Sequence, residues 1–473
     1  MSSPIQRELL RRLPSVNDLL RSQRASAWLA RQPQPLVADC LRTAVAQLRQ
    51  QILGDDGGRC GAHHVDDQAV LDRAEAQLAQ RTRPRLRGAI NATGIILHTG
   101  LGRAVLPACV VDSMVEELKG YVTLAVDRDS GQRVNRDLVV EPLLCELTGA
   151  EAATVVNNNA AATMLVLAAL GAGHEVIVSR GELIEIGGEF RLPDVMAQSG
   201  ARMVEVGATN RTHLRDYERA ITPQTALLFR AHPSNYRIVG FASSVPVTEL
   251  GALAHARGLA VVDDLGAGAL VGLEQFGLPH EPTMGESIAA GADVVLASTD
   301  KLIGAGQGGV IVGQRELIEK IRKHPLARAV RADKMCLMAL ERTLPLFRDM
   351  ERLKREHPMY RMLAAPMAEL SARAAVLAAA VAEAAPTADV SVADDVGYLG
   401  SGSLPMEALP TKVVNLRHGS VKTDHLARAL RLDEACVFAR VADNAVVMDV
   451  RTMTDEQVPT VAAAIGRSLN TGD

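Results

Sequence analysis

The stretch "ADVVLASTDKLIGAGQGGVIVG", residues 292–313, decides the fold. Its two apolar runs, 294–297 and 310–312, have the length and composition of buried strands. Between them lie the charged pair Asp300 and Lys301 and then four glycines within the six residues 304–309. A buried lysine needs a partner or a chemical role. We therefore expect Lys301 to lie at a functional site where a core strand ends.

Short apolar runs separated by alanine-rich segments continue from about residue 90 to residue 315. We predict strands at 153–156, 175–179, 202–207, 226–231, 259–264, 293–298 and 309–313. The segments between them are long enough for crossover helices, and continuous apolar strands joined in this way are typical of a mostly parallel sheet covered on both faces. The region is predicted to have an α/β fold.

The flanking regions have different patterns. Apolar residues at helical spacing, mixed with arginines, predict a helical region over 5–30 and 36–53, with another helix at 67–80. The basic stretch "RTRPRLRG" (81–88) is predicted to be an exposed linker. Beyond about residue 335 a helical section containing "SARAAVLAAAVAEAA" precedes short strands in "TKVVNLRH", "CVFARVAD" and "AVVMDVR". We expect a helical N-terminal domain at 1–85, an α/β domain at 86–330 and a small α+β domain at 331–473.

Composition limits the partners and the compartment. The chain has 473 residues and a formal net charge of -4, so an anionic partner must be met by local basic clusters. Six cysteines without a C-x-x-C motif favour a reduced, cytoplasmic protein. Cys60, His63 and His64 suggest a metal site, but no second cysteine pair is near, and a solvated loop is the better interpretation. No apolar run is long enough to span a bilayer. We expect a soluble protein without a metal and without a membrane or DNA partner.

Polar residues follow several predicted strands, and ligands of open α/β sheets lie beyond the carboxyl ends of the strands. An asparagine triplet opens the helix after 153–156, where it forms either an anion site with the free N–H groups of that helix or an ordinary helix cap. A carboxylate at a strand end can hold a protonated ring nitrogen, and a histidine there can stack on a planar ligand, although a lone histidine is more often structural. The candidates are Asn157, Asn158, Asn159, His232, Asp264 and Ser298, with Lys301 after them.

The order of these groups along the chain resembles that of fold-type-I pyridoxal phosphate (PLP) enzymes, similar to the aspartate aminotransferases. The resemblance implies that Lys301 bonds covalently to the cofactor aldehyde and later carries protons. It also implies that Asp264 keeps the pyridine nitrogen protonated, so that the ring accepts electrons. The glycines between 304 and 309 would let the backbone pass close to the cofactor.

A set of motifs in order resembles one family, the bacterial selenocysteine synthases (L-seryl-tRNA(Sec) selenium transferases). The motifs are "INATGIILHTGLGRA" (90–104), "VVNNNAAATMLVLAAL" (155–170), "SRGELIEIGGEFRLPDVM" (179–196), "HPSNYRIVGF" (232–241), "DLGAG" (264–268), "DKLIGAGQGGVIVG" (300–313) and "GYLGSGSLPMEALPTKVV" (397–414). Two positions depart from the family: Gly100 stands where Asn is common, and "GAGQGG" (304–309) replaces a Gly-Gly-Pro-Gln-Ala-Gly loop. Both changes retain small residues and affect loop geometry more than the reaction.

The resemblance implies that the chain converts seryl-tRNA(Sec) to selenocysteinyl-tRNA(Sec), with selenophosphate as the selenium donor. Lys301 would take the Cα proton, and Asp300 would orient or protonate the leaving group, or else form a structural salt bridge. Arg103, Arg328 and Arg331 match the anion-binding arginines of the family. Arg328 and Arg331, three residues apart, are predicted to face one side of a helix, a geometry suited to phosphate, and the alternative is a solvated helix face.

The family also forms a homodecamer, a pentamer of dimers with active sites between subunits, in which the N-terminal domains grip the tRNA. Two other functions remain open from the residues alone. A small-molecule PLP-dependent ammonia-lyase of the same superfamily would share the Lys and Asp motifs, but such relatives generally lack the helical extension. A catalytically silent tRNA-binding or scaffold protein would have no physical reason to retain a buried Lys301.

Overall fold

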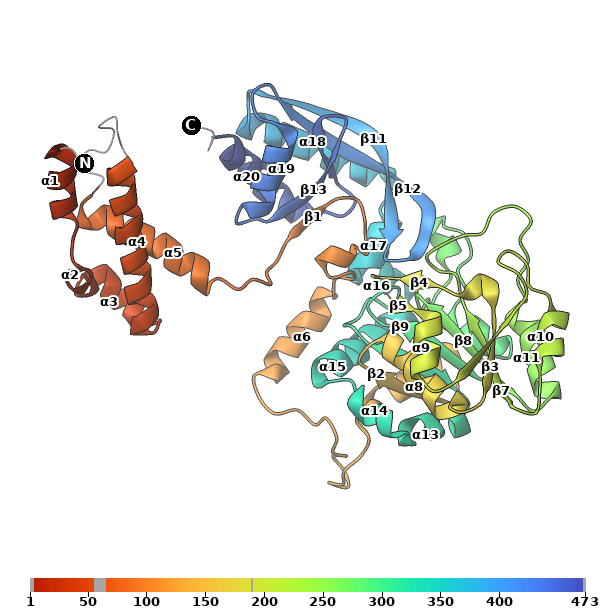
Figure 1. Ribbon diagram of the computed structural model, residues 1–473. Coiled ribbons are helices and arrows are strands. Elements are labelled where there is room, and N and C mark those ends of the chain that lie inside the picture. Colours follow the sequence, from red (N-terminus) through yellow and green to blue (C-terminus); the bar gives the residue numbers. More distant parts are fainter. Residues whose placement is uncertain (1–3, 55–64, 189, 471–473) are drawn as a thin grey trace. The chain divides into compact units, whose positions relative to one another are not determined.

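The computed structural model (Figure 1) describes residues 4–54, 65–188 and 190–470, and the chain falls into two compact units, Met1–Gly88 and Ala89–Asp473. The first unit is helical, as predicted. Its helices are α1 (Pro4–Arg12), α2 (Val16–Leu20), α3 (Gln23–Leu29), α4 (Gln34–Gly54) and α5 (Asp67–Thr82). Helices α2 to α5 share one core that includes Leu19, Leu41 and Val70, and Leu9 of α1 packs with Ile52 and Val65 in a smaller cluster. Cys60, His63 and His64, the metal candidates rejected above, lie outside the described residues.

The second unit is built around a seven-stranded sheet, and its strands are the seven predicted from the sequence. In spatial order they are β2 (Ala152–Val156), β10 (Gly309–Gly313), β9 (Val294–Ser298), β8 (Ala260–Gly266), β7 (Thr225–Ala231), β3 (Glu175–Ser179) and β6 (Arg202–Val206). Only β10 runs antiparallel to its neighbours, β2 and β9, while the other pairs are parallel. The parallel strands therefore end at one edge of the sheet.

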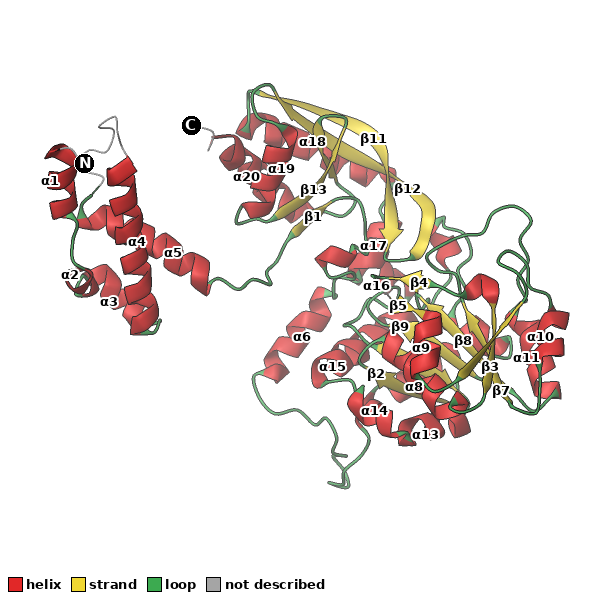
Figure 2. Ribbon diagram, viewed as in Figure 1, coloured by secondary structure: helices red, strands yellow, loops and turns green. Residues whose placement is uncertain are grey.

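Helices cover both faces of this sheet (Figure 2) because the buried strands are continuously apolar, so that successive residues present apolar side chains to opposite faces. One face packs against α8 (Asn159–Gly171), α9 (Leu192–Gln198) and α13 (Arg315–Lys323). The other packs against α7 (Glu141–Thr148), α10 (Leu214–Ala220), α11 (Val247–Ala256) and α12 (Met284–Ala289). Four further helices continue this layer or lie beside it: α6 (Ala108–Leu118), α15 (Lys334–Thr343), α16 (Met350–Glu356) and α17 (Pro358–Ala364). Helices α15 to α17 follow residue 330 in the chain but bury their side chains in the core of the large sheet.

A second core in the same unit lies under a five-stranded sheet. Its strands, in spatial order, are β1 (Ile90–Ala92), β13 (Val437–Ala442), β14 (Ala445–Asp449), β12 (Ser403–His418) and β11 (Ala388–Gly400), and its helices are α18 (Met367–Ala384), α19 (Thr423–Leu432) and α20 (Val458–Asn470). The sequence predicted parts of β12, β13 and β14 but neither β1 nor β11. Strand β1 pairs with β13, so the first residues after Gly88 complete a sheet whose other strands come from the end of the chain.

Among the described residues, no single helix has the length and apolar composition needed to cross a membrane. The bent pair of α17 and α18 meets that test only when the two helices are taken together.

Candidate functional site

A cavity of about 650 Å³ lies at the edge where the parallel strands end, beside the first turn of α8. Strands β7, β8 and β9 each contribute residues at or just beyond their last positions. The structure brings most of the predicted site residues to this cavity: Arg103, Asn158, Asn159, His232, Asp264, Ser298, Asp300 and Lys301. Asn157, Arg328 and Arg331 do not line it.

Lys301 follows β9 by three residues and is only 7% exposed. Its ammonium group has no hydrogen-bond or ion-pair partner within the described ranges 4–54, 65–188 and 190–470. Burial lowers the pKa of Lys301, and the positive charge of Arg103 lowers it further, while Asp264 acts in the opposite direction. The amine is therefore enclosed, without a direct partner among the described residues, and easier to deprotonate than an ordinary lysine, which are the properties of a nucleophile.

The carboxylate of Asp264 is held from two elements. Oδ1 accepts hydrogen bonds from Nδ2 of Asn159 at 2.8 Å and from the backbone N–H of Gly266 at 3.0 Å. Oδ2 accepts a bond from the hydroxyl of Thr163 at 2.7 Å. Enclosure by the protein raises the pKa of Asp264, and these three contacts oppose the rise by stabilising the ionised form. The carboxylate is thus positioned to meet a cationic group inside the cavity.

His232 is fixed through its backbone and one ring nitrogen. Its N–H donates to the carbonyl oxygen of Asp264 at 2.9 Å, and Nε2 lies 3.2 Å from Oε1 of the buried Glu281. Nδ1 is buried and has no hydrogen-bond partner in the described part of the chain. A buried nitrogen without a partner is costly in a folded protein, so the site suits a ligand that supplies one.

Arg103 and Asp300 form an ion pair at the wall of the same cavity. Nη1 of Arg103 lies 2.7 Å from Oδ2 of Asp300, and the backbone of Arg103 is in the left-handed region at φ +63°. A non-glycine residue in that region is strained and is usually kept for a reason. The pair brings a cation and an acid to within reach of Lys301, which is next to Asp300 in the chain.

The three asparagines of the triplet have different roles. The backbone N–H of Asn157 donates to the carbonyl oxygen of Val330 at 2.9 Å, and Asn157 is exposed. Oδ1 of Asn158 caps α8 by accepting the N–H of Ala161 at 2.8 Å, and Asn159 reaches Asp264. The helix-cap alternative is therefore correct for Asn158. The first turn of α8 still faces the cavity through Asn158, Asn159 and Ala160, where its free N–H groups suit an anion.

The glycine-rich loop of 304–309 is shaped by contacts with the protein. A Cβ on Gly309 would collide with the carbonyl oxygen of Asn158, and one on Gly304, at φ +68°, would collide with the ring of His357. The loop contributes Gln307 to the cavity wall. These two glycines are thus required by close packing of the loop against α8 and His357.

Arg328 and Arg331 line a second cavity, of about 360 Å³, together with Arg133 and Arg136. The prediction that both lie on one helix is wrong. Helix α14 (Pro325–Ala329) ends before Arg331, whose backbone forms a bridge with Val156 instead. Burial lowers the pKa of Arg136, and the neighbouring Arg331 and Arg328 lower it further. Clustered guanidinium groups of this kind favour an anionic ligand.

Sequence reasoning missed two residues that hold the site. Thr163 was detectable, since it lies four positions after Asn159 and therefore on the same face of α8. Glu281 lies in a loop before α12 and pairs with His232 from a distant part of the chain, so no local pattern points to it.

Comparison with known proteins identifies similar chains. The family model described as "L-seryl-tRNA selenium transferase" matches residues 89–454, and the model "Selenocysteine synthase N terminal" matches residues 10–49. A protein of Methylocella silvestris named L-seryl-tRNA(Sec) selenium transferase is 45% identical over 451 residues, covering 94% of this chain and 95% of its own. One of the same name from Rhizobium meliloti is 44% identical over 459 residues, covering 96% and 97%.

A solved structure titled "Structure of D-Glucosaminate-6-phosphate Ammonia-lyase" has the same fold, with a TM-score of 0.56 and 19% identity over 83% of this chain and 98% of its own. At that identity the likeness concerns the fold alone. The expected fold class is confirmed.

Proposed function

The chain belongs to the L-seryl-tRNA selenium transferase family, and from this membership we propose how its residues perform the reaction. It is a PLP-dependent enzyme of selenocysteine biosynthesis that converts seryl-tRNA(Sec) to selenocysteinyl-tRNA(Sec). The ammonia-lyase alternative is not favoured, because the relatives of similar length carry the transferase name over nearly the whole chain. One observation supports the assignment of the site above all: Lys301 is buried in the cavity that also holds Asp264, and no described residue forms a hydrogen bond or ion pair with its amine.

The cavity fits PLP. The unpaired amine of Lys301 suits the aldehyde, Asp264 suits the protonated pyridine nitrogen, and the buried Nδ1 of His232 lacks a partner that the cofactor would provide. The first turn of α8, with Asn158 and Asn159, would hold the phosphate, and Ser298 lies on the wall nearby. When bound, PLP supplies an electron sink for the charge left by loss of the Cα proton. Asn157 does not line this cavity: its backbone N–H holds the loop against Val330, and its Oδ1 accepts a hydrogen bond from Nδ2 of Asn158 at 3.3 Å.

Different residues around the cofactor carry out the different proton transfers of the reaction. Lys301 takes the Cα proton of the seryl group, and its lowered pKa favours the free amine that this step requires. Asp300 protonates or orients the departing β-hydroxyl, and Arg103 holds Asp300 in place through the ion pair at 2.7 Å. Selenium from selenophosphate then adds at Cβ, its bond to phosphorus is broken by water with release of phosphate, and Lys301 returns the proton to Cα.

The selenium donor is selenophosphate in this proposal, bound by Arg103, Arg328 and Arg331. Within one chain Arg328 and Arg331 line a different cavity from that of Lys301. In a site assembled between subunits the two cavities could lie together, since one chain would supply Lys301 and another chain would supply the cavity lined by Arg328 and Arg331. Such a site requires at least two chains, and from the family resemblance we also propose the homodecamer, a pentamer of dimers.

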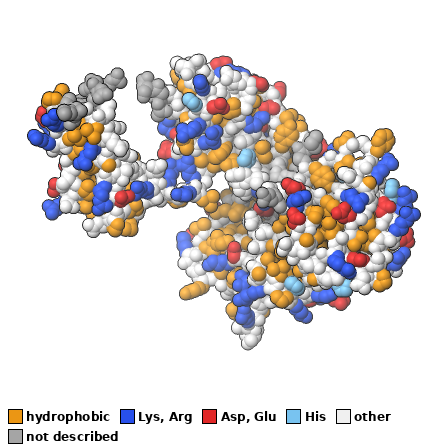
Figure 3. All heavy atoms as spheres, in the orientation of Figure 1, with side chains coloured by type: hydrophobic (Ala, Val, Ile, Leu, Met, Phe, Trp, Pro, Cys, Tyr) orange, Lys and Arg blue, Asp and Glu red, His pale blue; other side chains and the backbone are white. Residues whose placement is uncertain are grey.

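The N-terminal unit is proposed to bind the tRNA by its shape and its phosphates. Arg24 and Arg81 are paired with carboxylates of the same unit. Exposed arginines remain over its surface at Arg11, Arg12, Arg21, Arg42 and Arg49, and Figure 3 shows basic side chains spread over the visible face of this unit. The free cysteines, among the described residues, agree with a cytoplasmic location for an enzyme that acts on tRNA.

The test uses Lys301→Ala with Lys320→Ala, an exposed lysine of α13, as the matched control. Borohydride reduction of the loaded wild-type and control proteins, followed by peptide mass mapping, should find the cofactor on Lys301, and Lys301→Ala should show none. Formation of selenocysteinyl-tRNA from seryl-tRNA(Sec) and selenophosphate should fall at least about 100-fold in Lys301→Ala only. Labelling of another lysine would place the site elsewhere. A wild-type protein that leaves seryl-tRNA(Sec) unchanged would refute the function.

A further inference from the structure

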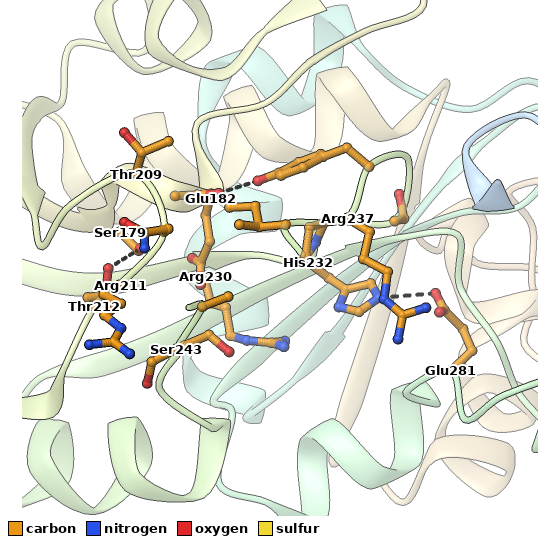
Figure 4. Close-up of a pocket in the computed structure, with 18 of the residues that line it drawn as sticks. Ser179, Glu182, Thr209, Arg211, Thr212, Arg230, His232, Arg237, Ser243 and Glu281 are labelled. Atoms are coloured by element: carbon orange, nitrogen blue, oxygen red, sulfur yellow. Dashed lines mark hydrogen bonds and ion pairs between the residues drawn. The ribbon is translucent and has the colours of Figure 1, made fainter. Parts of the chain in front are cut away.

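A second cavity, of about 500 Å³, adjoins the one that contains Lys301, and the two share His232 and Ser234 in their walls. Figure 4 shows this adjoining cavity, with Glu182 and Arg230 at its centre and Arg237, His232 and Glu281 on one side. Its volume is typical of a small-molecule site. None of the roles assigned above uses this space.

The deep part of the adjoining cavity carries a single unpaired acid. Glu182 ends the short 3-10 helix η4 (Arg180–Glu182), is 6% exposed, and accepts the N–H of Ala231 at 3.2 Å through Oε2. Arg230, which lies beside it, is already ion-paired with the buried Asp263 at 2.8 Å. Glu182 is therefore a buried carboxyl group without an ion-pair partner of its own among the described residues, and it faces an open volume.

Burial raises the pKa of Glu182 to about 7. Arg230 and the N–H of Ala231 oppose the rise, and Asp263 adds to it. The other titratable or charged groups that face Glu182 or line the same cavity are Tyr217, Tyr236, His232, His280, Glu281, Glu407, Arg211 and Arg237. Near neutral pH the group thus exists as both a carboxylic acid, which donates and accepts, and a carboxylate, which only accepts.

The walls and the rim differ from the deep part. Tyr236, Pro233, Pro279 and Ile238 give flat or apolar surface. At the rim Arg237 is 69% exposed and lies 3.4 Å from Glu407, a contact loose enough to be exchanged for a phosphate. From its rim to its deep part, the cavity therefore offers a cation at Arg237, a flat surface on which a base can stack, and the hydrogen-bonding carboxyl group of Glu182. These three features together match a nucleotide.

Resting on the proposed function, we propose that the adjoining cavity binds the 3'-terminal adenosine of seryl-tRNA, with the base edge at Glu182 and the preceding phosphodiester at Arg237. The seryl group is an ester of the ribose of that nucleotide. When serine lies against Lys301, the nucleotide must occupy space next to the reaction cavity, and the adjoining cavity shares its wall. Single-stranded ends are read through the Watson–Crick edges of unstacked bases in this way.

The chemistry of Glu182 explains a preference for adenine. The edge of adenine presents an acceptor and an amino donor side by side, so it pairs with a carboxylic acid through two hydrogen bonds. The edge of guanine offers two adjacent donors, N1–H and the amino group, and so favours the ionised carboxylate. Every tRNA ends in CCA, so the pocket recognises the end common to all tRNAs and leaves tRNA identity to be read elsewhere.

The test measures equilibrium binding of the dinucleotides CpA and CpG to the full-length, cofactor-loaded protein by calorimetry at pH 6 and pH 8. The phosphodiester keeps one charge over this range, so only the protein titrates. With a pKa of about 7, the acid form falls about tenfold between these two pH values, and CpA affinity should fall by the same factor. CpG affinity should rise.

Three variants make the test specific. Glu182→Gln retains a donor and an acceptor, so it should bind CpA within about twofold of the wild type at pH 6 and lose the pH dependence. Glu182→Ala should lose the preference for CpA over CpG. Arg237→Ala should weaken the binding of both dinucleotides and reduce the salt dependence of that binding by about one released counterion. Arg257 is also an exposed arginine, and Arg257→Ala should change neither quantity.

Equal binding of CpA and CpG at both pH values would overturn the proposal, as would a pH dependence that persists in Glu182→Gln, because another group of the cavity wall would then be its source. The same preparations are assayed for selenocysteinyl-tRNA formation. If the wild type forms product while dinucleotide binding ignores Glu182, only the adenosine site is wrong. If the wild type forms no product, the proposed function itself has failed.

Discussion

Replacing Thr163 with Val tests whether the hydrogen bonds around Asp264 exist to keep that carboxylate ionised for the cofactor. Thr163 is fully buried on α8, and its hydroxyl lies 2.7 Å from Oδ2 of Asp264 and 3.0 Å from the carbonyl oxygen of Asn159. Val has nearly the same shape and no hydroxyl. The change therefore removes one of the three contacts that oppose the raised pKa of Asp264 and leaves the packing of the helix intact.

The magnitude follows from the charge of the acceptor. A hydrogen bond to an ionised group contributes about 1.5–3 kcal/mol, which corresponds to about 10- to 150-fold in an equilibrium constant. Since the cofactor needs the ionised form of Asp264, its affinity should fall by a factor in that range. The pKa of Asp264 rises further in the variant, and the carboxylate protonates as the pH falls. The deficit in affinity should therefore be larger at pH 6 than at pH 8.

The assay is a titration of cofactor-free protein with PLP, followed by visible absorption. Thr343→Val is the matched control: Thr343 is equally buried in a helix, but its hydroxyl donates at 2.7 Å to the carbonyl oxygen of Ala339 and meets no carboxylate. Thr163→Ser, which keeps the hydroxyl, should retain most of the affinity. If Thr163→Val and Thr343→Val bind PLP equally well at both pH values, Asp264 does not depend on Thr163 and its assignment to the ring nitrogen loses its support.

Two further predictions concern stability. Arg322→Met should lower the free energy of unfolding, measured with urea, by about 3–5 kcal/mol. The reason is that Asp137 and Glu141, each 3.0 Å from the guanidinium group, remain buried without the arginine that pairs with them. A loss below about 1 kcal/mol would contradict this. His357 is buried, and its pKa is lowered to about 4 because burial disfavours the charged ring. Since the unfolded chain binds this proton near pH 6.5 and the folded chain does so only near pH 4, stability is lost as the pH falls through that window, by about 3 kcal/mol. His357→Gln keeps an N–H donor for the carbonyl oxygen of Ile303 and should remove that share of the acid sensitivity, as measured by urea unfolding at pH 7 and pH 4.

The sequence predicted the large sheet well because its strands are buried on both sides. Such strands are continuously apolar, and each of the seven is separated from the next by clear helical or turn segments. The position of Asp264, His232 and Lys301 in one cavity followed from the same pattern, since residues after parallel strands meet at one edge. Strand β11 was missed because much of it is exposed and carries three aspartates, so it lacks an apolar run.

The features that could not be predicted from the sequence depend on contacts between distant segments of the chain. Arg331 follows Arg328 at helical spacing, but the chain leaves the helix at Val330 to bridge β2, a pairing invisible in the local pattern. Helices α15 to α17 follow the predicted boundary at 330 yet complete the core of the large sheet, because their apolar faces match it. Glu281 reaches His232 from a loop. In each case tertiary packing decides between alternatives that are locally equivalent.

The asparagine triplet shows how one short stretch serves several parts of the site. A phosphate cradle alone would require only free N–H groups at a helix start, which many residues could provide. Here the backbone of Asn157 is tied to Val330 in the arginine-bearing segment, Asn158 caps α8, and Asn159 holds Asp264. The triplet therefore joins the segment between Arg328 and Arg331, the helix proposed to hold the cofactor phosphate, and the acid assigned to the ring nitrogen. The side-chain oxygen of Asn158 and the side-chain amide of Asn159 each make one of these bonds, so asparagine is needed at both positions. At the first position the bond to Val330 uses only the backbone N–H, and the side chain of Asn157 accepts a single hydrogen bond, from Nδ2 of Asn158 at 3.3 Å.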